Sequence, residues 1–374
     1  MKIELQAKET SKALKMVTAA IDARPIVPIM AGIRIQTDGD SSVILTASNG
    51  QRQVTRRLAA TVKEAGEATV DGKKLAQMFN SLPGSTIIMD APDGKPSMTL
   101  KSGSSKFTIA LLTGDMPSRP GVNTEEAATA ELYAADLLEG LSRVRYAVST
   151  EATRMELTGV YTTISDGTMN FVALDGFRMG VSRKNCAETS GERSVVVPAE
   201  TVDQIIAMCN DAAPGEFVFV ETDSKTIHVQ TETADLNSGL IAGEYPDYKK
   251  IVPRDSATSI RFDADMLVNA LKRADIAASK SKLIKLSVRD GEMQIRSNDP
   301  TNTATFDEII PCQKMGDDVE TAYNIRYALD VMNAISTEEV QLDLKTPVSP
   351  GLLKPVNGGK ELHILLPVRV VNNE

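Results

Sequence analysis

Three stretches of the sequence share one pattern: ELQAKETSKALKMV (4–17), ELYAADLLEGLSRV (131–144) and RFDADMLVNALKRA (261–274). Each begins with a short run typical of a β-strand and continues with apolar residues at helical spacing. The stretches are offset by 127 and 130 residues. Solenoid repeats are only about 20–50 residues long. The sequence therefore predicts three copies of a whole domain.

A second set of amphipathic helices recurs with nearly the same period. In each, four apolar residues lie at positions i, i+3, i+4 and i+7, which forms one stripe along a helix. The stripes are Leu75, Met78, Phe79 and Leu82; Val202, Ile205, Ile206 and Cys209; and Ala328, Val331, Met332 and Ile335. Each repeat thus contains two predicted helices.

Between the helices lie alternating runs such as SVILTAS, STIIMDA, FVFVETD and KELHILLP, which are typical of half-buried antiparallel strands. Two helices on one face of such a sheet make a two-layer α+β domain. Segments rich in proline and polar residues place the expected domains at 1–125, 126–253 and 254–374. If the sheets join edge to edge, the array curves, and two arrays can close into a ring that hides the sheet edges.

The charge of the chain gives two opposing indications. Lys and Arg total 41 against 50 Asp and Glu, a net charge of −9, which argues against binding to nucleic acid. Yet five of the six predicted helices carry basic residues, and only the fourth, with Glu200 and Asp203, does not fit. The basic residues are Lys8, Lys12, Lys15, Lys73, Lys74, Arg143, Arg145, Lys272, Arg273 and Arg326. A basic helical surface and ordinary solvated helix faces both remain open.

The sequence contains no strong signature of catalysis. It has no phosphate-binding glycine loop, and His228 and His363 lie in strand-like runs without metal-ligand spacing. Asp175-Gly176 is more typical of a turn than of an acid–base pair. We therefore expect no catalytic residue, metal or cofactor. With three scattered cysteines, a charged N-terminus and no membrane-spanning run, we expect a cytoplasmic protein.

Four motifs resemble the bacterial sliding clamps, the beta subunits of DNA polymerase III. They are LDGFRMGV (174–181), GEYPDYKKIVP (243–253), YNIRYALDVMNAI (323–335) and LLPVRV (365–370). The resemblance extends over the whole chain. It implies three similar domains per chain and a head-to-tail homodimer, closed as a ring with helices around the hole. It also implies a non-enzymatic processivity factor that encircles double-stranded DNA without regard to sequence.

The resemblance implies a site for partner peptides between the second and third domains. The expected partners are the polymerase III alpha subunit, the clamp-loader complex, and other polymerases and repair proteins. The matching residues are Leu157, Leu174, Gly176, Phe177, Arg178, Met179, Pro246, Lys250, Ile251, Asn324, Tyr327, Val348, Ile364, Leu365, Leu366, Pro367, Val368 and Arg369. For GEYPDYKKIVP alone, a turn whose tyrosines pack as a hinge is the alternative interpretation.

Two further sets of residues follow from the helices and the resemblance. The expected DNA-facing residues are Lys12, Arg24, Arg143, Arg154, Lys272 and Arg273. The expected dimer contacts are Lys73, Lys74, Phe107, Ile109, Ile276 and Ala277.

The sequence departs from the family pattern at several of these positions. Leu174 and Phe177 replace a common Thr and His, Lys250 replaces an Arg, and Pro350 replaces a Ser. Met155-Glu156 replaces an aromatic pair, and Ala277 replaces a larger residue. Thr301, Asn302 and Thr303 stand where an acidic cluster can pair with Lys73 and Lys74, so we expect a weaker dimer. Five residues follow Arg369.

Two other classes of function are compatible with the sequence. One is a repeat-built interaction scaffold that never meets DNA. The other is a hydrolase or transferase whose site lacks a recognisable motif. Retention on closed circular DNA separates the clamp from the scaffold, and turnover by the purified protein indicates an enzyme.

Overall fold

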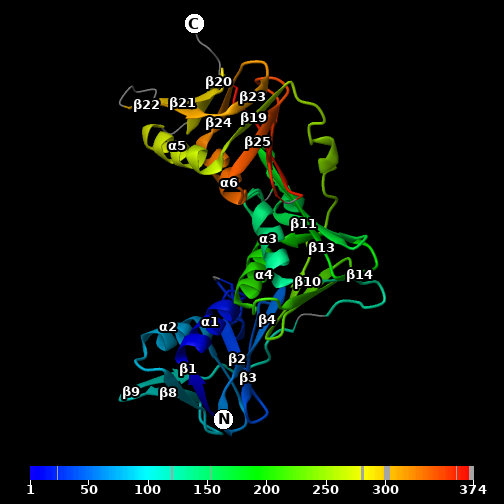
Figure 1. The fold of residues 1–374 in the computed structure, drawn as a ribbon. Coiled ribbons are helices and arrows are strands. Elements are labelled where there is room, and N and C mark those ends of the chain that lie inside the picture. Colours follow the sequence, from blue (N-terminus) through cyan, green and yellow to red (C-terminus); the bar gives the residue numbers. More distant parts are fainter. Residues whose placement is uncertain are drawn as a thin grey trace. The chain divides into compact units, whose positions relative to one another are not determined.

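The structure is a computed structural model that describes residues 1–22, 24–118, 121–151, 153–278, 282–298, 304–358 and 360–369. The chain divides into two compact units. Figure 1 shows its helices and strands, coloured along the sequence. Unit 1 comprises Met1–Leu138, Ile164–Gly167 and Cys186–Leu240, and unit 2 comprises Glu139–Thr163, Thr168–Asn185 and Ile241–Glu374. Among the described residues, no helix is long and apolar enough to cross a membrane.

Unit 1 contains two antiparallel sheets. The first has the order β5 (Thr61–Glu64), β1 (Lys2–Gln6), β7 (Thr86–Asp90), β8 (Ser97–Ser102) and β9 (Ser105–Ala110). The second has the order β14 (Glu188–Ser190), β10 (Ala128–Tyr133), β16 (Phe217–Thr222), β17 (Thr226–Gln230), β18 (Ala234–Gly239), β4 (Arg52–Ala59), β3 (Ser42–Ser48), β2 (Gly32–Asp38) and β6 (Glu67–Asp71). The second sheet is continuous between repeats because β18 pairs with β4, with Leu236 opposite Val54.

Unit 2 also contains antiparallel sheets. One has the order β22 (Thr305–Pro311), β21 (Glu292–Asn298), β20 (Leu283–Arg289) and β24 (Val319–Asn324). The other includes β12 (Thr168–Leu174), β13 (Arg178–Asn185), β27 (Leu362–Leu365), β26 (Gly351–Pro355), β25 (Glu339–Leu344), β19 (Thr258–Asp263) and β23 (Gln313–Gly316) in that order. The pairing of β13 with β27 joins the second repeat to the third. Two further strands are β11 (Gly159–Ser165) and β15 (Arg193–Pro198).

All six predicted helices are present. They are α1 (Ala7–Thr18), α2 (Gly72–Ser81), α3 (Ala134–Arg145), α4 (Ala199–Asp211), α5 (Ala264–Ala277) and α6 (Ile325–Ala334). Short 3₁₀ turns occur at Pro28–Ala31, Met155–Leu157 and Tyr248–Lys250. The side chains of Asp71, Asp263 and Asn324 cap α2, α5 and α6 by accepting hydrogen bonds from first-turn amides. The apolar stripes of the paired helices α1 and α2, and α5 and α6, pack together above their sheets.

The structure explains why the fourth predicted helix is acidic. Glu200 in the first turn of α4 pairs with Arg52 of β4 at 3.0 Å, and Asp211 at its end pairs with Arg56 at 2.5 Å. Arg52 and Arg56 are on the same face of β4 as buried Val54, so they lie under the helix layer. The carboxylates of α4 therefore balance guanidinium groups from the preceding repeat.

The α+β class and the two helices per repeat are confirmed. The boundaries at 125 and 253 remain predictions. The compact units divide the second repeat because its strands contribute to a sheet in each unit. Segments rich in proline and polar residues predict loops along the chain, but they do not predict which strands of neighbouring repeats join into one sheet.

Candidate functional site

A tight hairpin between β12 and β13 forms the centre of the candidate site. The Asp175 Oδ1 atom accepts hydrogen bonds from the backbone amides of Phe177 at 2.9 Å and Arg178 at 3.0 Å. Gly176 has a φ of +91°, which glycine adopts without steric cost. Asp175-Gly176 therefore forms a turn, as the sequence predicted. The turn leaves the Phe177 side chain 55% exposed.

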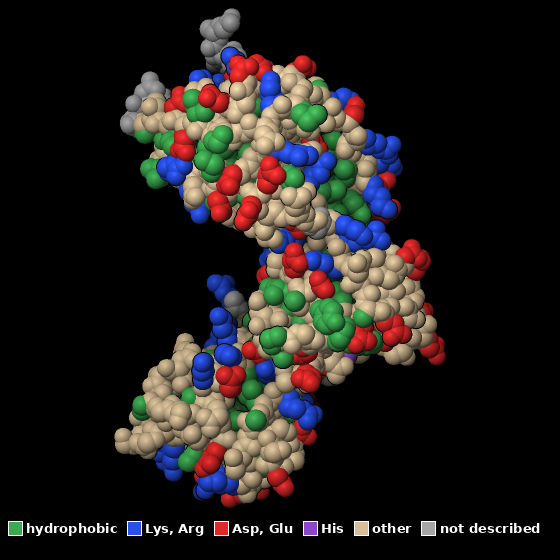
Figure 2. Space-filling view, in the orientation of Figure 1, with side chains coloured by type: hydrophobic (Ala, Val, Ile, Leu, Met, Phe, Trp, Pro, Cys, Tyr) green, Lys and Arg blue, Asp and Glu red, His purple; other side chains and the backbone are tan. Residues whose placement is uncertain are grey.

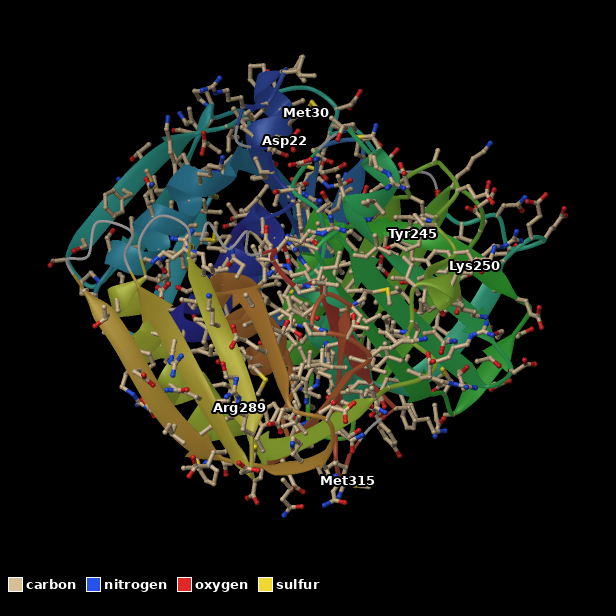
Figure 3. All side chains as sticks on the ribbon, turned by 90° about the horizontal axis from the view of Figure 1, so that it is seen from above. Asp22, Met30, Tyr245, Lys250, Arg289 and Met315 are labelled. Carbon is tan, nitrogen blue, oxygen red and sulfur yellow. The ribbon has the colours of Figure 1, made fainter. Side chains whose placement is uncertain are left out.

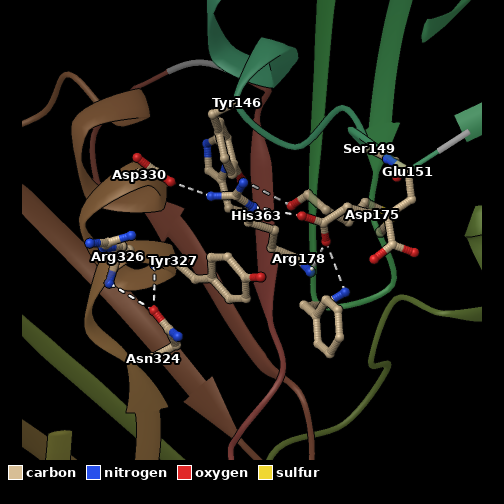
Figure 4. Close-up of polar contacts among 12 residues, drawn as sticks. Tyr146, Ser149, Glu151, Asp175, Arg178, Asn324, Arg326, Tyr327, Asp330 and His363 are labelled. Atoms are coloured by element: carbon tan, nitrogen blue, oxygen red, sulfur yellow. Dashed lines mark hydrogen bonds and ion pairs between the residues drawn. The ribbon is translucent and has the colours of Figure 1, made fainter. Parts of the chain in front are cut away.

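Arg178 holds this hairpin to helix α6. Its Nε donates to Asp175 at 2.9 Å, and its Nη1 donates to Asp330 of α6 (Figure 4). The guanidinium also lies 4.5 Å from the ring centre of Tyr327, which stacks with Phe177 at 5.8 Å. Burial lowers the pKa of Arg178, but the hydrogen bonds that its guanidinium donates to Asp175 and Asp330 outweigh this effect, and the net pKa is raised. Arg178 therefore stays charged and fixes Phe177 beside Tyr327.

An apolar cluster lies beside the hairpin. Six buried side chains form it: Leu157, Val172, Leu174, Met179, Leu352 and Ile364. Tyr245, Tyr248 and Val252 pack against the cluster, as do Tyr161, Val181, Leu362 and Leu366. The rings of Tyr161 and Tyr245 stack at 4.8 Å, and Tyr248 meets Tyr161 edge-on at 6.3 Å. Segment 245–252 is thus anchored through aromatic and aliphatic side chains.

The segment after β27 runs along the hairpin and then along β24. The amide of Leu366 donates to the carbonyl of Phe177, and the amide of Val368 donates to the carbonyl of Ala322, both at 2.8 Å. Val368 remains partly exposed. The segment therefore connects the Phe177 hairpin with the third repeat. We call the hairpin, the six-residue cluster, Tyr327 and residues 364–369 the Arg178 site.

A histidine is buried in the strand that supports the site. His363 is fully buried, and its Nδ1 lies 2.9 Å from the hydroxyl of Tyr146. Burial, together with the charge of Arg143, lowers the pKa of His363 to about 3. Burial raises the pKa of Tyr146. Both groups are therefore neutral near pH 7 and act as structural hydrogen-bond partners.

The structure brings most of the expected peptide-site residues together. Leu157, Leu174, Met179 and Ile364 belong to the buried cluster, and Phe177, Arg178 and Tyr327 form the stacked group. The remaining members have less direct roles. Asn324 is occupied in capping α6, and Val348 is exposed in the turn before β26. Figure 3 shows Tyr245 and Lys250 on the segment that leads into the third repeat. Lys250 is exposed and pairs with Asp247 at 3.1 Å.

Sequence reasoning missed several members of this arrangement. Asp175 and Asp330 hold Arg178, and Tyr161 stacks on Tyr245, but none of the three was expected in the site. The tyrosine content of GEYPDYKKIVP was the available signal. The alternative interpretation is a turn whose tyrosines pack as a hinge; the packing of Tyr245 and Tyr248 is observed, and the hinge remains a prediction.

Four of the six expected DNA-facing residues form ion pairs, and three of them are arginines: Arg143, Arg154 and Arg273. Arg143 is a correction, because its side chain is only 12% exposed and pairs with Glu139 and Glu361. It also donates to the Ala334 carbonyl and to Ser336, and so joins α3 to the end of α6. Arg273 makes two hydrogen bonds to Glu308, and Arg154 pairs with Glu156.

The other expected basic residues are more open to solvent. Lys8, Lys12 and Lys15 are exposed on one face of α1, and Arg24 is exposed in the following loop. Figure 2 shows Lys and Arg side chains gathered over this helix. Lys12 pairs with Glu9 at 3.5 Å. Lys272 is exposed on α5.

The expected dimer residues separate into exposed and buried sets. Ile276 is largely exposed at the end of α5, and Phe107 is partly exposed on β9. Ile109 and Ala277 are buried within the chain, so they have little surface left for a partner. Lys73 donates to the Asp22 carbonyl at 3.1 Å. Thr301, Asn302, Thr303 and the tail after Arg369 lie outside the described residues.

Comparison with known families accounts for nearly the whole chain. Residues 1–118 match the model for the N-terminal domain of the DNA polymerase III beta subunit. Residues 131–247 match its central domain, and residues 249–369 match its C-terminal domain. The chain belongs to the DNA polymerase III beta subunit family. The members of this family are sliding clamps of DNA replication.

Individual relatives and structures agree with this assignment. The chain is 27% identical to the beta sliding clamp of Synechococcus elongatus and 28% identical to that of Caulobacter vibrioides. Each alignment covers 99% of this chain and 100% of the relative. The DNA polymerase III beta subunit of Thermotoga maritima has a similar fold, with a TM-score of 0.89 at 22% identity. A Pseudomonas aeruginosa sliding clamp bound to griselimycin gives a TM-score of 0.88 at 23% identity. Both structural alignments cover 99% of this chain and 100% of the other.

Among the described residues, no cluster of three or more His, Cys, Asp or Glu side chains could hold a metal ion. The three cysteines are spread over both units, and Cys209 is buried.

Proposed function

We propose that the Arg178 site is where this sliding clamp captures peptide segments of its partners. The observation that carries the proposal is the pairing of a fixed, exposed aromatic residue, Phe177, with a neighbouring apolar cluster. Peptide sites generally combine a pre-formed apolar surface with a few polar anchors. Arg178 and the turn made by Asp175 provide the pre-formation, because they hold Phe177 before a peptide arrives.

The composition of the site indicates which peptides bind. Leu174 is buried in the cluster, and Phe177 stacks with Tyr327, so the hairpin presents carbon surface rather than hydroxyl or imidazole groups. Exposed Ile251 and Val348 add apolar groups, whereas Lys250 offers a point charge. We expect peptides with at least two large apolar residues. The proteins proposed to carry such peptides are the polymerase III alpha subunit, the clamp loader, other polymerases and repair proteins.

The clamp acts as a closed ring of two chains in this proposal. β9 and β22 each end a sheet, so one side of each strand lacks a neighbour in its own sheet. Such edges are suited to pairing between chains. Phe107 on β9, and Ile276 and Ile309 at the other edge, are exposed apolar residues beside them. Pairing of β9 with β22 of a second copy, head to tail, would cover both edges.

DNA is retained by enclosure and not by tight contact. A ring that slides needs only a weak, non-specific attraction to phosphates. Lys12, Arg24 and Lys272 are the proposed contacts. Ion pairs with Glu156 and Glu308 reduce the attraction of Arg154 and Arg273 for phosphates. The chain itself is proposed to be non-catalytic and to act in the cytoplasm, where replication takes place.

Two measurements test this function. With a clamp-loading ATPase and ATP supplied, the protein should remain on nicked circular DNA through gel filtration and leave when the circle is cut. Equal loss from circular and linear DNA would refute enclosure. A dye-labelled peptide from the C-terminus of a polymerase alpha subunit should bind the wild type and bind Phe177→Ala at least about tenfold more weakly. Met315→Ala removes another exposed apolar residue from unit 2 and serves as the control. Equal peptide affinity in all three proteins would refute the site.

A further inference from the structure

Unit 1 carries an exposed aromatic cluster that the clamp function does not use. Tyr133 at the end of β10 stacks on Phe217 at the start of β16, with ring centres 4.3 Å apart. Phe219 is two residues further along β16 and therefore on the same face. The three side chains are 48%, 39% and 37% exposed. The alternate residues Leu132, Val218 and Val220 are buried, so the aromatic cluster occupies the face opposite the core.

The threefold repeat shows that the fold does not require aromatic residues here. In each repeat, the strand that leads into the first helix pairs with a neighbouring strand. The last pair of opposed residues includes the residue just before that helix. This position is occupied by Gln6 and Thr86 in the first repeat, Tyr133 and Phe217 in the second, and Asp263 and Glu339 in the third. The first and third repeats form the same pair of strands with polar residues. The aromatic pair is therefore a specific property of the second repeat.

The surroundings of the aromatic cluster are acidic. The next register position on the same face, two residues along each strand, places Glu188, Glu131 and Phe219 side by side across β14, β10 and β16, and Gln230 and Asp235 continue this row. The following position contributes Ser190, Thr129, Glu221, His228 and Asn237. Neither row contains Lys or Arg. The face thus combines aromatic rings with several carboxylates, and His228 is hydrogen-bonded to Asp235 at 2.9 Å.

We propose that this face is a second docking surface, which binds a cationic segment of a partner protein. The faces of aromatic rings attract ammonium and guanidinium groups. Carboxylates beside the rings increase that attraction and repel DNA and acidic segments. The cluster is two strands wide and two register positions long, about 5 by 7 Å between side-chain positions, which suits a segment of about three or four residues. The occupant is thus a short strand or loop with a Lys or Arg beside an apolar residue.

The test uses the full-length protein and a dye-labelled peptide of three lysines and two leucines, followed by fluorescence anisotropy. The wild type should bind this peptide with an affinity that falls as salt rises. A peptide with glutamates in place of the lysines should not bind. Phe177→Ala should bind the lysine peptide as the wild type does, which separates this face from the Arg178 site.

Two variants locate the binding. Tyr133→Gln combined with Phe217→Thr installs the first repeat's own pair, and it should weaken the peptide about tenfold because both rings are lost. Because aromatic cross-strand pairs also stabilise sheets, its thermal unfolding is measured alongside. Glu131→Gln combined with Glu188→Gln leaves the rings in place and should reduce the salt dependence. The second variant decides the question if the first does not fold.

Several results would overturn the proposal. They are no binding of the lysine peptide by the wild type up to about 1 mM, equal binding by the folded variants, and equal binding of the glutamate peptide. A native mass that rises with concentration in the wild type, but not in the Tyr133→Gln and Phe217→Thr variant, would instead make a second copy of the chain the occupant.

Discussion

Replacement of Arg178 should reveal how the hairpin and helix α6 hold each other. Arg178→Met keeps the length of the side chain but removes the guanidinium. Its partners differ in burial: the Asp175 side chain is 11% exposed and that of Asp330 is 45% exposed. The two contacts should therefore contribute unequally to the free energy of unfolding.

The expected magnitudes follow from these exposures. Breaking a buried ion pair costs about 3–5 kcal/mol, and Asp175 should fall at the low end because it still accepts two backbone hydrogen bonds. The half-exposed pair with Asp330 contributes about 0.5–1 kcal/mol, and contact of the cation with Tyr327 adds about 0.5 kcal/mol. We expect Arg178→Met to cost about 3–4 kcal/mol and Asp330→Asn no more than about 1 kcal/mol. Arg178→Lys, which keeps one charged contact, should lie between them.

Tyrosine fluorescence measures this directly. The chain has no tryptophan, and six of its seven tyrosines are in unit 2, all except Tyr133. Urea unfolding followed by this signal should therefore report the unit that contains Arg178. With a slope of about 2–3 kcal/mol per molar urea, Arg178→Met should lower the midpoint by about 1–2 M. A midpoint shift equal to that of Asp330→Asn would show that the buried contact with Asp175 is not the main one.

Of four further predictions, two concern pH, one the dimer and one the backbone. The pKa of His363 is about 3 in the folded chain against 6.5 when unfolded. The contribution of neutral His363 to stability is therefore present above pH 6.5 and is lost as pH falls toward 3, by up to about 1.4 kcal/mol per pH unit. His363→Gln should flatten the pH dependence of the urea midpoint, and an unchanged slope would contradict this. The hydrogen bond that the His228 ring donates to Asp235 raises the pKa of His228. The contribution of this pair to stability is therefore present below pH 6.5 and lost as pH rises through the folded pKa, and His228→Asn should cost more at pH 6 than at pH 8. Ile276→Asp, at an exposed position, should shift the native mass toward one chain in sedimentation. It should lower the free energy of unfolding by no more than about 0.5 kcal/mol. An unchanged dimer would remove Ile276 from the interface. Gly316→Ala should destabilise the pairing of β19 with β23, because Gly316 has a φ of +100° and an added Cβ would lie 2.0 Å from the Ala257 carbonyl oxygen. The expected result is faster hydrogen exchange of the amides in these strands. Exchange at the wild-type rate would contradict this.

Much of the fold follows from short-range patterns. The stripe formed by Leu75, Phe79 and Leu82 needs only helical geometry to become one apolar face, and these residues are buried. The Asp175-Gly176 turn likewise depends on neighbouring atoms alone. Because these local patterns recur with one period along the chain, they predict the same domain three times. The motifs then located the hairpin, β27 and the start of α6 as parts of one candidate site.

Burial and charge pairing were harder to predict. Phe107 and Ile109 have the same parity on β9, yet only Ile109 is buried. Arg143 has the sequence appearance of a free basic helix residue, but its partners Glu361 and Ala334 come from the third repeat. Glu200 departs from the basic pattern of the other helices because it pairs with Arg52 of β4, 148 residues away along the chain.

The sequence by itself determined the helices, the strands, the threefold repeat and the family, because these depend on periodicity and on contiguous motifs. Tertiary structure alone decided which charges are neutralised, which apolar residues remain exposed and how Arg178 fixes Phe177. The physical reason is that Coulomb interactions and burial depend on distance in space. Asp330 is 152 residues from Arg178 along the chain, yet the fold places the two side chains in contact.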